Sequence, residues 1–60
     1  NAMIEITDTK NRKVILKESD IESLSLNDET GLVHTDNGNA PLIISAEQYF
    51  RLRELLGVRI

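Results

Sequence analysis

His34 is the side chain in this sequence best suited to acid–base or metal chemistry, and it is the only histidine. A catalytic imidazole needs a second titratable group beside it in a pocket, and a zinc site needs further histidine or cysteine ligands. The chain has no cysteine. We therefore predict that His34 lies at the surface or packs on a sheet, and we expect no metal site.

Acidic turns and glycines are the other patterns that could carry chemistry. Asp28–Glu29 and Asp36–Gly38 match fragments of calcium-binding loops, but the alternating ligands and the closing glutamate are missing. Ordinary turn chemistry accounts for both segments. The glycines Gly31, Gly38 and Gly57 are too scattered to form a phosphate-binding loop. We expect neither enzymatic activity nor a cofactor.

Positive charge gathers at two places, which could in principle form a phosphate-binding face. The groups are Lys10, Arg12, Lys13 and Lys17 on the one hand and Arg51, Arg53 and Arg59 on the other. Ten acidic against seven basic residues nevertheless give a net charge of -3. The aromatic residues that could stack on bases are limited to Tyr49 and Phe50. Nucleic-acid binding is therefore not expected.

The length of 60 residues allows one domain, which we place at residues 3–60. A domain of this size buries only about 60% of the surface that its unfolded chain exposes. Such domains usually rely on disulfides, a metal or a second subunit, and we expect the last of these here. Asn1–Ala2 is interpreted as the remnant of an expression tag. No apolar run is long enough to span a bilayer or form a signal peptide, so a cytoplasmic protein is expected.

Hydrophobic spacing divides the chain at Ser45. Before this residue the apolar side chains alternate in short bursts, as in strands, and after it they recur at helical spacing. The pattern predicts an α+β domain. Its expected form is a small curved antiparallel sheet of four to five strands, built from two hairpins, with one C-terminal helix packed on it.

The first hairpin is predicted to join Met3–Thr7 to Val14–Lys17. Its loop is placed at residues 9–11, with Asn11 in the left-handed conformation that asparagine tolerates. A third strand is predicted at Ile21–Leu26, with a bulge near Glu22 or a helical turn beginning at Ser19 or Asp20, because its apolar residues do not keep one parity. Residues 27–31 have the composition of a turn that ends in glycine.

The second hairpin is predicted to pair Leu32–Thr35 with Ala40–Ile44 around Asn37 and Gly38. Asn-Gly is typical of type I′ turns, in which both central residues need positive φ. In that register Pro41 would face His34, where its missing N–H would interrupt the ladder. We therefore expect a longer loop, or pairing that begins only at Leu42, and an edge position for this strand.

The helix has clear predicted ends and an apolar residue left over. Ser45 with Gln48 three residues later predicts a capping box, and Gly57 a left-handed C-cap. The arc that the sheet should cover consists of Tyr49, Leu52, Leu55 and Leu56. Phe50 lies beyond this arc, and Leu32 and Ile43 point to the opposite side of their hairpin from its other apolar residues. We predict a homo-oligomer with Phe50, Leu32 and Ile43 at its interface, and Pro41 favours face packing over edge pairing.

The order of these segments resembles the FlbD family of small flagellar-operon proteins. The resemblance rests on Met3–Thr7 followed by Asn11, on Asp20–Leu24, and on the Asn37-Gly38 pair before a helix that begins at a serine. The sequence departs from that family's pattern at Arg12, where glycine is usual, and at Ala40–Pro41. The resemblance implies a single small domain without enzymatic activity or known site residues, acting in bacterial motility or its regulation.

Two other interpretations remain open at this point. The strand order and the Asp20–Leu24 segment also resemble the LytTR-type DNA-binding domain, although that domain is longer and more basic. A small subunit of a phage or mobile-element assembly is the third, which rests on size and on the lack of motifs. In each case we expect a binding or assembly module whose protein partner the sequence does not name.

Overall fold

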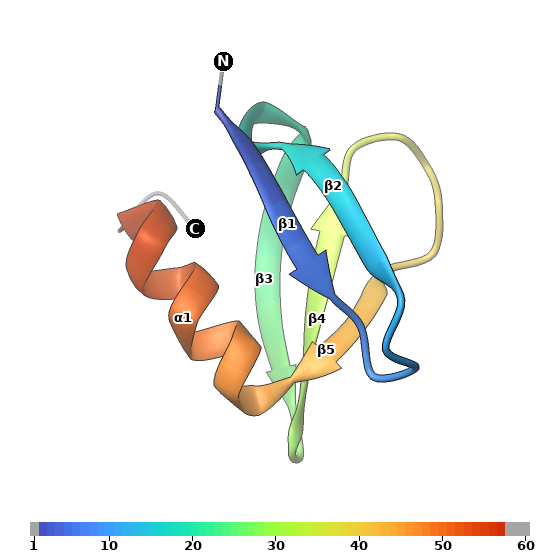
Figure 1. The fold of residues 1–60 in the computed structure, drawn as a ribbon, viewed down its shortest axis with the longest axis vertical. Helices are drawn as coiled ribbons and strands as arrows, with labels where there is room; N and C mark the ends of the chain where they lie inside the picture. Colours follow the sequence, from blue (N-terminus) through green and yellow to red (C-terminus); the bar gives the residue numbers. More distant parts are fainter. Residues whose placement is uncertain (1, 58–60) are drawn as a thin grey trace.

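The computed structural model describes residues 2–57. Asn1 and Arg59, which enter the tag and basic-cluster interpretations, lie outside this range. In chain order the elements are β1 (Met3–Thr7), β2 (Lys13–Lys17), the 3-10 turn η1 (Glu18–Asp20), β3 (Ile21–Asn27), β4 (Thr30–Thr35), β5 (Leu42–Ser45) and α1 (Ala46–Leu56). In Figure 1 the β1–β2 hairpin crosses in front of β3, β4 and β5, and α1 lies to one side.

The fold is α+β as predicted, but its strands form two sheets instead of one. Within the described chain, β1 and β2 form a two-stranded sheet, and β3, β4 and β5 form a three-stranded sheet in that order. All pairs are antiparallel. The 3-10 turn η1 lies between β2 and β3, where the chain passes from one sheet to the other. The sheets meet where the Thr9 N–H donates to the carbonyl of Ile43 at 3.0 Å.

The first hairpin has the predicted register. Ile4 faces Leu16 and Ile6 faces Val14. Asn11 takes the predicted positive φ, at 65°, which closes the loop between the two strands. Strand β2 begins at Lys13, one residue earlier than predicted.

The β3–β4 hairpin corrects the prediction for residues 27–31. The turn lies at Asp28 and Glu29, between the paired residues Asn27 and Thr30, and Asp28 has a φ of 56°. Gly31 is therefore not a turn residue but a buried strand residue. The expected irregularity near Glu22 is confirmed, because the register shifts between Ile21 and Ser23. A 3-10 turn also precedes β3, beginning at Glu18.

The β4–β5 hairpin has a wide loop, as predicted. Pairing begins at Leu42, opposite Val33, and Pro41 precedes the strand. Strand β5 lies at the edge of its sheet. The Asn37-Gly38 pair does not form the type I′ turn that such pairs often adopt, since only Gly38 has positive φ, at 81°. The Asn37 side chain orders the loop instead, because its Oδ1 accepts hydrogen bonds from Thr35 Oγ1 at 2.7 Å and from Asn39 N–H at 3.0 Å.

The helix α1 begins at its predicted cap. Ser45 Oγ accepts a hydrogen bond from the backbone N–H of Gln48 at 3.1 Å, the first half of a capping box. Gly57 has the predicted positive φ of 72°, but its ψ of -155° lies outside the left-handed helical region. That combination is essentially restricted to glycine.

The core lies between the two sheets and the helix. It consists of Ile4, Ile6, Ile21, Val33, Ile44, Tyr49, Leu52 and Leu56. Three of these, Ile6, Val33 and Ile44, have no solvent exposure. Helix α1 packs on β3, β4 and β5. The prediction that Leu55 belongs to the covered arc is wrong, because its side chain is 68% exposed.

Candidate interaction surface

The structure separates the residues that the sequence predicted to form one interface. Leu32 and Ile43 face each other on β4 and β5, half-buried and 49% exposed respectively. They alternate with the core residues Val33 and Ile44, so they lie on the outer face of the sheet. Phe50 lies on α1, which packs on the inner face. These side chains therefore do not form one continuous patch.

Phe50 is partly satisfied within its own chain. Its ring is 52% exposed and meets the ring of Tyr49 edge to face, with the centroids 5.0 Å apart and the planes at 77°. Such geometry is favourable for an aromatic pair. Part of the apolar surface of Phe50 is therefore already used, although the sequence alone left it without a partner.

A hollow lies on the other side of α1, between the helix and strand β1. Its walls are formed by Met3, Ile4, Glu5, Gln48, Arg51, Leu52 and Leu55, and its volume is about 210 Å³. We call it the β1–α1 groove. Met3 and Leu55 are 57% and 68% exposed, so two of the most exposed large apolar side chains of the molecule line one depression. A second hollow, lined by Arg51, Glu54 and Leu55, adjoins it along the helix.

The groove combines apolar walls with one charge of each sign. Ile4 and Leu52 form its buried part, Glu5 lies on the strand side and Arg51 on the helix side. Apolar groove residues framed by polar ones are typical of surfaces that bind another protein. Sequence reasoning missed this site because the helical wheel assigned Leu55 to the core. The signal that could have found it is the pair of charged residues, Arg51 and Glu54, on the turn that also carries Leu55.

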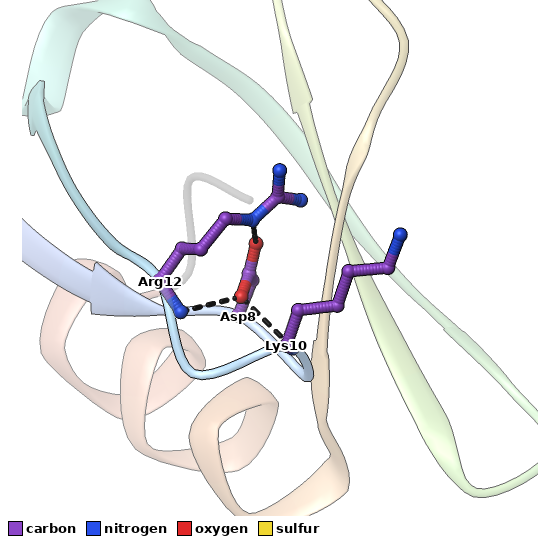
Figure 2. A network of polar contacts seen from close by, with 3 residues as sticks. All are labelled: Asp8, Lys10 and Arg12. Atoms are coloured by element: carbon purple, nitrogen blue, oxygen red, sulfur yellow. Dashed lines mark hydrogen bonds and ion pairs between the residues drawn. The ribbon is translucent and has the colours of Figure 1, made fainter.

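Asp8 is the most extensively bonded polar side chain described, and it fixes the β1–β2 loop. Figure 2 shows its carboxylate between Lys10 and Arg12. Asp8 Oδ1 accepts from the N–H groups of Lys10 at 2.9 Å and Arg12 at 2.8 Å, and Oδ2 accepts from Arg12 Nε at 2.8 Å. The side chain is almost fully buried. Its acceptor capacity is spent on the loop, so we assign Asp8 a structural role.

The bonding of Asp8 also sets its acidity. The backbone N–H of Arg12 is the main cause that lowers the pKa of Asp8 below its ordinary value of 3.8, with smaller contributions from the Arg12 side chain and Lys10. Burial acts in the opposite direction and raises the pKa. The loop therefore favours the ionised carboxylate. Sequence analysis did not single out Asp8, although an aspartate that opens a turn commonly bonds the N–H groups that follow it.

His34 lies on the outer face of the three-stranded sheet, in agreement with a sheet-packing position. It is half-buried, and its Nε2 is 2.9 Å from Ser25 Oγ on the neighbouring strand. A cross-strand pair of this kind links β3 to β4. Within residues 2–57, no group of three potential ligands among His, Cys, Asp and Glu could hold a metal ion.

Comparison with known proteins adds no family to this description. Protein-family models, curated proteins and solved structures gave no match to the chain. In the part of the chain that the structure describes, no helix is long and apolar enough to cross a membrane. The fold and the groove together define a small α+β domain with an open apolar surface beside one helix.

Proposed function

We propose that this protein is a non-catalytic assembly module that associates with further copies of itself through exposed apolar side chains beside α1. The observation that carries the proposal is the β1–α1 groove, because Met3 of β1 and Leu55 of α1 are both exposed and line the same hollow. The molecule is small, with a total accessible surface of 4330 Å². Covering such side chains supplies buried apolar area that a chain of this length lacks.

Helix α1 offers two alternative interfaces, one along each border: the β1–α1 groove on one side and the exposed ring of Phe50 on the other. We favour the groove. Phe50 already contacts Tyr49. Leu55 is more exposed than Phe50 and shares a hollow with Met3, and the side chains that contribute most to binding are those that fill well-packed, fully desolvated pockets. The predicted interface of Phe50, Leu32 and Ile43 thus becomes the second choice.

Oligomeric mass measured by light scattering at tens of micromolar tests the proposal. We expect a dimer for the unmodified chain, a monomer for Leu55→Glu and a dimer for Phe50→Glu. A dimer lost only in Phe50→Glu would transfer the interface to the other border of the helix. A monomer for the unmodified chain at every accessible concentration would contradict the proposal.

The biological setting that we propose is bacterial motility, and its support is the resemblance of Met3–Thr7, Asp20–Leu24 and the Asn37-Gly38 pair to the FlbD family. Deletion of the gene in its native host, followed by measurement of swimming in soft agar, tests this setting. We expect reduced swimming that the intact gene restores. Normal swimming would place the module in another process without changing the expected assembly.

A further inference from the structure

The backbone of β1 has one edge paired with β2 and one edge that faces away from it. In an antiparallel pair, successive residues direct their N–H and C=O groups alternately to the partner strand and to the other side. The backbone carbonyl of Ala2 accepts a hydrogen bond from Glu18 N–H at 2.9 Å, and the backbone N–H of Asp8 donates to the carbonyl of Arg12 at 2.9 Å. Even-numbered residues of this segment therefore pair with β2.

The odd-numbered residues direct their backbone groups outward. Thr9 confirms this direction, because its N–H leaves the hairpin and donates to Ile43 of β5. Figure 1 shows α1 running beside β1 on the side away from β2. The β1–α1 groove lies between these two elements. Among the described residues, the outward N–H and C=O groups of Met3 and Glu5 have no hydrogen-bond partner. An open strand edge of this kind is a template for another strand.

We propose that the second copy docks by pairing its own β1, antiparallel, with the outer edge of β1, which seats each β1 in the groove of the other subunit. This inference rests on the proposed function and specifies its geometry. The two-fold axis passes beside Ile4, so Met3 lies opposite the partner's Glu5 and Glu5 lies opposite the partner's Met3. The β1–β2 sheets of the two copies then form one continuous four-stranded sheet.

Charge complementarity favours a second copy of this chain as the occupant of the groove, and it favours the register in which Met3 lies opposite the partner's Glu5. The groove holds one cation, Arg51, among its described lining residues, and β1 of a second copy would bring one anion, Glu5, into it. Two copies thus bring two carboxylates and two guanidinium groups together, a self-complementary set of the kind that a two-fold interface requires. A register that placed Glu5 directly opposite the partner's Glu5 would set like charges against each other.

Edge pairing through β1 also differs from the face packing that Pro41 suggested. Pro41 precedes β5, whose outer edge is partly used by Thr9. The open edge belongs to the other sheet, in which neither strand contains proline. The proline beside the β5 edge therefore does not argue against pairing through the edge of β1, which belongs to the other sheet.

Proline substitution at two opposed residues gives a direct test. Glu5 and Ile15 face each other across the hairpin as a non-hydrogen-bonded pair, so each directs its N–H away from the other strand. Glu5→Pro removes an N–H from the groove edge, whereas Ile15→Pro removes the same group from the far edge of β2. Edge strands tolerate proline, and circular dichroism checks that both variants fold. We expect a monomer for Glu5→Pro and an unchanged dimer for Ile15→Pro.

A charge exchange provides the second test, which does not depend on proline. Glu5→Arg and Arg51→Glu should each weaken the dimer, by about tenfold or more in the dissociation constant measured by sedimentation equilibrium. The double exchange should restore most of the affinity. Arg53→Glu, on the same helix but outside the groove, is the matched control and should leave the affinity unchanged.

The outcomes separate this inference from the proposed function. A dimer that persists in Glu5→Pro and in Arg51→Glu would overturn pairing through β1 while the assembly function stands. An unmodified chain that remains monomeric would overturn both. If Glu5→Pro fails to fold, the charge exchange decides, and a double exchange no tighter than the single variants contradicts the pairing.

Discussion

The two sides of α1 differ in how closely they meet the rest of the molecule. On the side of β4 the contact is so close that a Cβ atom built on Gly31 would lie 2.6 Å from the Cβ of Tyr49. On the side of β1 the same helix leaves a groove of about 210 Å³. Leu56, a core residue outside the groove, is 6% exposed, whereas Leu55, the residue before it, is 68% exposed.

This difference assigns the two sides different tasks. The packed side stabilises the fold, because its side chains lose nearly all contact with water. The open side leaves apolar and backbone groups without partners, which costs the isolated chain stability but leaves them available to another molecule. Substitutions on the packed side should therefore change unfolding, and substitutions on the open side should change association.

Replacing one leucine by alanine on each side of α1 tests this difference most directly. Leu56→Ala should reduce the free energy of unfolding by about 2–5 kcal/mol, the usual range for a buried leucine. Leu55→Ala should change the stability of the monomer by no more than about 0.5 kcal/mol, because its side chain is mostly in water. Urea denaturation at low protein concentration measures both. Equal losses would show that the two sides are packed alike.

Gly31→Ala tests the closeness of the packed side. The added methyl group would meet Tyr49 and Ile44, so we expect a loss of about 1–3 kcal/mol as Tyr49 is displaced. Gly38→Ala serves as a control in open space, where only the positive φ opposes alanine and a smaller loss follows. Thermal melting of the two variants compares them. A Gly31→Ala variant as stable as the unmodified chain would mean that α1 and β4 are further apart than described.

Ser45→Ala weakens the beginning of the helix that both sides share. Loss of the hydroxyl that accepts the Gln48 N–H should cost about 0.5–2 kcal/mol. Ser45→Asp, which keeps an acceptor at the cap, should retain most of the stability. An unchanged denaturation midpoint for Ser45→Ala would mean that the cap contributes nothing to the fold.

The smallest effect on stability is expected at the β1–β2 loop, which contacts the other sheet through Thr9 and lies away from the groove. Because the pKa of Asp8 is lower in the folded chain than in the unfolded chain, its stabilising effect is complete above the ordinary value of 3.8 and is lost as the pH falls through the lower folded value. Asp8→Asn keeps an amide oxygen as acceptor but removes this titration. Denaturation midpoints measured from pH 5 downwards should fall more steeply for the unmodified chain. Parallel pH profiles would contradict the role of Asp8.

Much of the fold could be predicted from local patterns, since local rules decide those features. The first hairpin followed from alternation and from the tolerance of Asn11 for positive φ. The start of the helix was predicted from Ser45, whose hydroxyl accepts a hydrogen bond from the backbone N–H of Gln48. The β5 boundary followed from the missing N–H of Pro41. Each of these depends on residues that are neighbours in sequence or directly paired.

The errors concern features that depend on distant packing. One sheet was predicted where two exist, because nothing in Glu18–Asp20 reveals in which direction η1 sends the chain. Gly31 was assigned to a turn, since its close approach to Tyr49 is visible only in three dimensions. Leu55 was assigned to the core for the same reason, and the groove was therefore missed. A helical wheel cannot show that a groove lies between β1 and the helix.

Amide hydrogen exchange at Glu5 and Ile15 tests most directly whether the open side of α1 is where two copies meet. Both amides point away from the other strand of their hairpin, so both should exchange quickly in a monomer. We predict that at high protein concentration the Glu5 amide becomes protected while the Ile15 amide does not, and that dilution removes the protection. Equal and rapid exchange of the two amides at every concentration, in a sample whose mass is that of a dimer, would contradict the account.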